Sequence, residues 1–91
     1  MTQISVERKH SLGREAARQK AAVLVEKLAR EYGLQARWDG DTVRVERSGA
    51  NGTVRIGDDT IRIDLKLGMM LSIMGPSIKT EIERSLEKEF A

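Results

Sequence analysis

The stretch TIRIDLKL at residues 60–67 decides the fold class. Every second side chain in it, from Ile61 to Leu67, is apolar, and the residues between them are charged. This period of two predicts a β-strand with one buried face and one face in water. A sheet built from such strands is covered on one side only.

Shorter stretches upstream repeat the same alternation. Turn-forming residues at 39–41, 48–52 and 57–59 separate them, which predicts an antiparallel meander. The meander has three or four strands, depending on whether the Trp38 segment is counted. The first strand must join it, and we place that strand beside the one at 60–67. The alternating apolar pairs are Ile4 and Val6, Ala36 and Trp38, Val43 and Val45, and Val54 and Ile56.

Two stretches have the period of an amphipathic helix instead, at residues 14–32 and 76–90. We expect Ser11 to be the N-cap of the first helix and Gly33 its left-handed C-terminal residue, while Pro76 opens the second helix. Each helix has one apolar stripe, so both are expected on the apolar face of the sheet. The sequence thus predicts one α+β domain over residues 1–91, in the order β-α-β-β-β-α. The stripes are Ala17, Ala21, Leu24, Leu28 and Tyr32, and Ile78, Ile82, Leu86 and Phe90.

Composition limits the possible functions. The chain has 16 basic and 14 acidic residues, and their signs are interleaved, so its net charge of +2 is weak evidence for an anionic partner. It has no cysteine, which excludes disulfides, thiolate metal sites and thiol catalysis. We expect a cytoplasmic protein with no signal peptide and no transmembrane segment.

No catalytic, cofactor or metal signature is present. His10 and Ser11 are neighbours at a strand–helix junction and lack a nucleophile-elbow motif, so they are expected to be turn residues. Gly49 and Gly52 lie between strands, where they form a turn rather than a phosphate cradle. We therefore expect no enzyme activity, no cofactor and no metal. The acidic residues of the turns, which lack calcium-loop spacing, are Asp39, Asp41, Asp58 and Asp59.

The polar face of the predicted sheet is the first candidate for binding. It has a basic excess, which is compatible with an anionic partner such as nucleic acid or a phospholipid head group. The alternative is a solvated face held by cross-strand ion pairs. The chain has one Trp, one Tyr and one Phe, all in apolar phase, which counts against nucleic acid. The basic residues of this face are Lys9, Arg37, Arg44, Arg55, Arg62 and Lys66.

The connector at residues 68–75 is the second candidate, because it has more large apolar side chains than a short loop easily buries. Methionine is common at adaptable binding surfaces. If exposed, the connector could contact a partner protein, a second copy of the chain in a homodimer, or an apolar surface. The alternative is that it closes one end of the core. The apolar residues are Met69, Met70, Leu71, Ile73 and Met74.

The chain also resembles a small bacterial family, the putative polyhydroxyalkanoic acid system proteins, which are named for genes beside those of polyester storage granules. The resemblance implies a role around such granules, at their surface or in regulating their formation, and it transfers no catalytic residue. The layout is also similar to a reduced helix-grip domain, a fold that often holds an apolar ligand between sheet and helix. The residues that carry the family resemblance are 10–13 with Ala17 and Arg18, Tyr32, Gly33, 38–41, 49–52, Leu67, Gly68, and the helix from Pro76 to Phe90.

These observations lead to one expected function and two alternatives. The expected function is that of a non-catalytic accessory protein of polyhydroxyalkanoate storage, acting by protein or granule-surface contact. The first alternative is a binding module for an anionic ligand on the basic face. The second is a carrier of a small apolar ligand, which would need a cavity of roughly 300 Å³ or more. The first helix is expected to fill that space.

Overall fold

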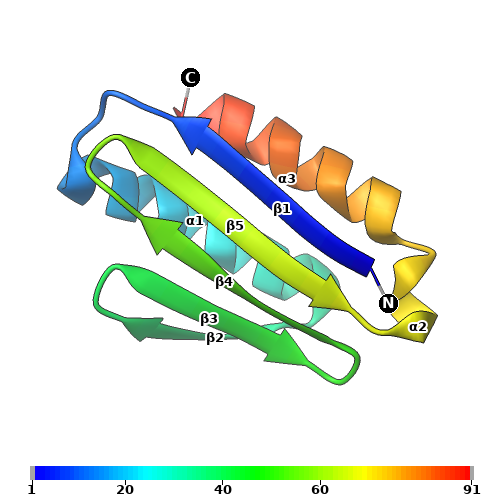
Figure 1. The fold of residues 1–91 in the computed structure, drawn as a ribbon. Helices are drawn as coiled ribbons and strands as arrows, with labels where there is room; N and C mark the ends of the chain where they lie inside the picture. Colours follow the sequence, from blue (N-terminus) through cyan, green and yellow to red (C-terminus); the bar gives the residue numbers. More distant parts are fainter. Residues whose placement is uncertain (1, 91) are drawn as a thin grey trace.

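The computed structural model describes residues 2–90 and has two layers, a sheet and a pair of long helices on one of its faces (Figure 1). The sheet is antiparallel and five-stranded, in the order β1-β5-β4-β3-β2. The predicted α+β class, with a single antiparallel sheet and both helices on one face, is confirmed. The elements are β1 (Thr2–Lys9), α1 (Arg14–Tyr32), β2 (Gln35–Asp39), β3 (Thr42–Arg47), β4 (Ala50–Ile56), β5 (Thr60–Leu67), α2 (Met69–Ser72) and α3 (Gly75–Phe90).

The strand at residues 60–67 is β5, which lies between β1 and β4 in the sheet. It pairs with β4 on one side and with β1 on the other, where Thr2 lies opposite Leu67. The predicted position of the first strand beside the last is therefore correct. The structure has two elements that the predicted order lacks. The Trp38 segment is the fifth strand, β2, so the meander has four strands, and the connector contains the short helix α2.

The core lies between the inner face of the sheet and the two long helices. Ile61 is fully buried in β5, and Ile82 of α3 is 1% exposed. Ala17 and Ala21 of α1 are also fully buried, and their small side chains let the helix lie close to the sheet. In a helix-grip domain a ligand would occupy the space between sheet and helix. Here the side chains of α1 occupy that space.

The ends of the helices show one correct prediction and one error. Gly33 has φ 66°, and the N–H of Leu34 donates to the carbonyl of Ala29 at 3.0 Å, which is the predicted left-handed ending. Ser11 is not the N-cap. That position belongs to Gly13, whose φ of 82° turns the chain and whose carbonyl accepts from the N–H of Ala17 at 3.0 Å.

The second long helix begins one residue earlier than predicted, at Gly75, so that Pro76 is its second residue. The N–H of Ile78 donates to the carbonyl of Met74 at 2.9 Å, which ties the start of α3 to the connector. The helix therefore follows α2 almost without a break.

Candidate contact surfaces

The connector between β5 and α3 exposes most of its apolar side chains. Met69, Met70 and Ile73 are 84%, 90% and 87% exposed, and Met74 is 42% exposed. We call these four residues the apolar tip. Leu71 is different, because it is partly buried against the core and lies against the turn at Gly49. The alternative that the connector closes the core thus holds for Leu71 alone.

The backbone explains why the apolar tip stays exposed. The N–H of Gly68 donates to the carbonyl of Gly49 at 2.7 Å, and the hydroxyl of Ser72 donates to the carbonyl of Gly68 at 2.9 Å. These bonds hold α2 beyond the end of β5, at one end of the molecule (Figure 1). A single helical turn points its side chains in all directions, so only one of them can face the core.

The polar face of the sheet, which we call the open face, lies opposite the helices. Strand register places all six predicted basic residues on it, because each alternates along its strand with residues of the helix-covered face. Arg62 has acidic partners there, with Asp64 at 2.9 Å and Glu7 at 3.8 Å. Bonds from Arg62 and then from the hydroxyl of Ser5 lower the pKa of Asp64. The Arg62–Glu7 pair joins β5 to β1, as the cross-strand interpretation expects, whereas Arg62 and Asp64 lie on the same strand.

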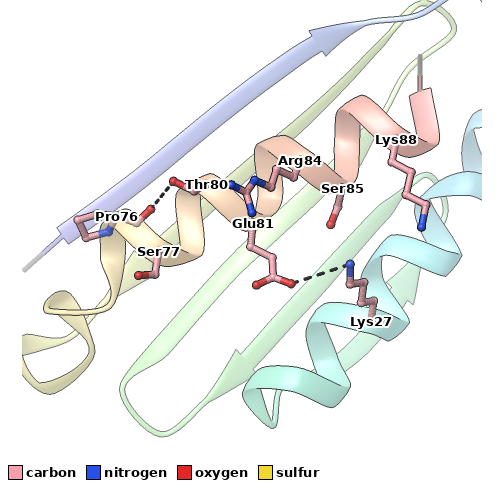
Figure 2. Close-up of a pocket in the computed structure, with 8 residues that line it drawn as sticks. All are labelled: Lys27, Pro76, Ser77, Thr80, Glu81, Arg84, Ser85 and Lys88. Carbon is pink, nitrogen blue, oxygen red and sulfur yellow. Dashed lines mark hydrogen bonds and ion pairs between the residues drawn. The ribbon is translucent and has the colours of Figure 1, made fainter.

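A third surface, a groove of about 570 Å³ between α1 and α3, is not evident from sequence periodicity. Figure 2 shows Glu81 reaching from α3 toward Lys27 on α1, where the carboxylate and ammonium are 3.9 Å apart. The hydroxyl of Tyr32 donates to the other carboxylate oxygen of Glu81 at 3.2 Å. Glu81 therefore links α3 to α1, and we call the contact of Glu81 with Lys27 and Tyr32 the helix clasp. The groove is lined by Lys27, Pro76, Ser77, Thr80, Glu81, Arg84, Ser85 and Lys88.

The clasp shifts the titration of its members. Partial burial, followed by the hydrogen bond to Glu81, raises the pKa of Tyr32 to about 12. A hydrogen bond between Glu31 and Glu81 raises the pKa of Glu31 and lowers that of Glu81. The Glu81 carboxylate faces both Tyr32 and Lys27. The sequence pattern identified the apolar ring of Tyr32 as part of the helix stripe. It did not reveal the role of the hydroxyl, because periodicity does not show which distant residue the polar end of a phenol meets.

His10 and two of the acidic turn residues make structural contacts, although the buried Nε2 of His10 has no hydrogen-bond partner among the described residues. His10 is 8% exposed, its ring lies 5.6 Å from that of Phe90, and its Nδ1 accepts a bond from the N–H of Leu12 at 3.2 Å. Arg14 pairs with Asp41 at 3.3 Å and with Asp58 at 3.1 Å, so these acidic turn residues anchor the start of α1.

Within residues 2–90, no group of three or more histidine, aspartate or glutamate side chains is arranged to hold a metal ion. In the same range, no helix has the length and apolar character needed to cross a membrane.

Comparison with known proteins agrees with the resemblance in the sequence. Over 97% of its length the chain matches 83% of the NMR structure of PA4090 from Pseudomonas aeruginosa, with a TM-score of 0.59 and 9% identity, which is a likeness of fold. No curated protein matches the chain. The sequence model described as "Putative polyhydroxyalkanoic acid system protein" matches residues 4–90. Because this match covers nearly the whole sequence, the chain belongs to the polyhydroxyalkanoic acid system protein family.

Proposed function

We propose that the chain is a non-catalytic accessory protein of polyhydroxyalkanoate storage and that it contacts the granule through the apolar tip. The observation that carries the proposal is the exposure of Met70 and Ile73, at 90% and 87%. Family membership supports the link to storage polyester. We expect a protein found in the cytoplasm and at the granule surface.

The size and shape of the apolar tip favour an apolar phase over a partner protein. A stable protein–protein interface uses roughly 20–30 residues on each side. The tip offers four apolar side chains on one end of the molecule, which is too small a surface for such an interface. A convex tip can instead insert into the alkyl and ester groups of a polyester surface without needing a complementary groove.

The expected energetics are those of reversible attachment. Removing one fully exposed Met or Ile side chain from water contributes about 1.5–3 kcal/mol. Part of this gain is offset by the loss of side-chain and overall freedom on binding, which is greatest for flexible methionines. A tip of this size therefore supports exchange between the granule and water rather than permanent insertion.

Co-sedimentation with isolated storage granules tests the proposal. The variant Met70→Ser/Ile73→Ser should stay in the supernatant, while wild type sediments with the granules. A matched control is Leu12→Ser/Val23→Ser, which removes two exposed apolar side chains far along the chain from the tip and should sediment like wild type. Unfolding of each variant is followed in parallel, so that loss of structure is not mistaken for loss of contact.

Other outcomes would reject granule contact. If wild type remains in the supernatant, or if both double variants sediment equally, the tip is not the attachment site. If the tip instead binds a second copy, wild type will be a dimer in the absence of granules and the tip variant a monomer. Analytical ultracentrifugation of the two proteins measures this.

A further inference from the structure

Three arginines gather on the part of the open face that lies over β2, β3 and β4. Arg37 and Arg44 are direct partners in the β2–β3 register. In the β3–β4 register Thr42 lies opposite Arg55 and Thr53 lies opposite Arg44, so Arg44 and Arg55 are diagonal neighbours. Direct partners have Cβ atoms about 4.5–5.5 Å apart, and diagonal ones about 7–8 Å, within reach of long side chains. We call Arg37, Arg44 and Arg55 the arginine cluster.

The arginine cluster has no acidic partner within the described chain. Of residues 2–90, none places a carboxylate within 4.0 Å of these three guanidinium groups, and all three residues are exposed. Arg62, which lies directly opposite Arg55 in the β4–β5 register, pairs with both Glu7 and Asp64, and the charge of Arg55 also helps to lower the pKa of Asp64. Like charges directly opposite one another destabilise a sheet. Folding therefore gains nothing from placing Arg37 against Arg44, and an anion between them would relieve the repulsion.

We propose that the arginine cluster is a binding site for a phosphate group, carried by a small phosphorylated molecule or by a lipid head group. The planar guanidinium group donates paired hydrogen bonds that match the spacing of phosphate oxygens. Thr53 lies opposite Arg44 in the β3–β4 register and adds a hydroxyl donor. Arg44, Thr53 and Lys66 line a depression of about 450 Å³ on the open face, which Glu46 and Asp64 also line, while Arg37 and Arg55 lie outside it. The proposal is independent of the apolar tip.

The same face is poorly suited to single-stranded nucleic acid. Proteins that read single strands on a sheet stack the bases on exposed aromatic side chains. Trp38 lies opposite Val43 and thus on the helix-covered face, where Arg18 lies over its ring at 5.6 Å. Tyr32 and Phe90 belong to helices. Isolated phosphate groups, rather than a stacked strand, fit what the open face offers.

A titration of the ¹⁵N-labelled chain with inorganic pyrophosphate tests the site. We expect saturable amide shifts centred on Arg37, Arg44, Thr53 and Arg55, and binding about tenfold weaker in Arg44→Gln, because one charge-assisted pair of bonds is lost. The control Arg30→Gln removes an equal charge from α1, where Arg30 pairs with Glu26, and should bind like wild type. Arg44→Gln should be at least as heat-stable as wild type, since it removes like-charge repulsion. This separates loss of binding from loss of folding.

A second binding experiment, with lipid vesicles, identifies the molecule that carries the phosphate group. Sedimentation with phosphatidylglycerol–phosphatidylcholine vesicles that is lost in Arg44→Gln assigns the site to a lipid head group. Pyrophosphate binding without vesicle binding assigns it to a small molecule. Three results would overturn the proposal: no saturable shift with pyrophosphate, equal weakening in both glutamine variants, or much tighter binding of a single-stranded oligonucleotide with shifts across the whole open face.

Discussion

Strand β5 and the apolar tip are neighbours in the chain and both contain large aliphatic or thioether side chains, but these side chains have opposite environments. The apolar side chains of β5, from Ile61 to Leu67, are at most 6% exposed. Two residues further on, Met69 begins a segment whose side chains are up to 90% exposed. The apolar side chains themselves are similarly hydrophobic in the two segments, so their hydrophobicity cannot explain the difference. Shape explains it, because a strand aligns its apolar side chains on one face whereas a one-turn helix spreads them around its axis.

The difference separates apolar residues that stabilise the fold from those that do not. Burying a side chain such as Ile61 stabilises the folded state relative to the unfolded chain, in which it meets water. Ile73 meets water in both states, so it contributes little to folding. An apolar surface that folding does not require is available for another role, and this is the basis for assigning the tip to contact with an apolar phase.

The largest expected effect is a loss of stability on substitution of a buried side chain of β5. Ile61→Ala should lower the free energy of unfolding by about 2–5 kcal/mol, because it leaves a cavity at a fully buried position. The same substitution at Ile73 is the matched control and should change that free energy by no more than about 0.5 kcal/mol. Urea denaturation followed by Trp38 fluorescence measures both. Equal costs at the two positions would contradict the distinction.

An intermediate effect is expected at Leu71, which belongs to the connector but packs on the core. Leu71→Ser should cost about 1–2 kcal/mol, because a partly buried leucine contributes less than a fully buried one. Thermal unfolding compared with that of Met70→Ser provides the measurement. If the two variants melt at the same temperature, Leu71 does not anchor α2.

The smallest expected effect concerns the helix clasp, where α3, the helix after the apolar tip, meets α1. Tyr32 is the only tyrosine, so phenolate absorbance during an alkaline titration reports it alone. We expect a pKa of about 12, and a lower value in Glu81→Gln, although partial burial will still keep it above 10. Since the folded-state pKa is raised, the stabilising contribution of Tyr32 is complete below about pH 10 and is lost as the pH rises through about 12. A normal pKa in wild type would show that the Tyr32–Glu81 bond does not form in solution.

The existence and the faces of the strands were predictable because periodicity is a local property. The start of β4 was predicted wrongly, because Ala50, Asn51 and Gly52 were assigned to a turn but pair with both neighbouring strands. Alternation put all six basic residues on the open face, and strand register agrees. Gly33 was predictable as well, because a helix ending with φ 66° favours glycine. Ser11 was misassigned because an N-cap residue type is common in any turn, and only the path of the chain makes Gly13 the cap.

The candidate surfaces were predictable only in part. The pattern of large apolar residues identified the connector, but their exposure depends on the bond between Gly68 and Gly49, residues nearly twenty positions apart. The basic face was identified as six residues, whereas its division into a paired half and the unpaired arginine cluster depends on register. The clasp of Tyr32 and Glu81 joins two helices and has no local signal.

The sequence by itself determined the class of the fold, the two faces of every strand, the apolar stripes of the helices and the family. It did so because these features follow from the order of polar and apolar residues over short distances. Only the tertiary structure decided that Leu71 alone turns inward, that Glu81 bridges α1 and α3, and that Arg44 stands between Arg37 and Arg55. Each of these depends on which distant segments are brought together, and side-chain periodicity has no information about that.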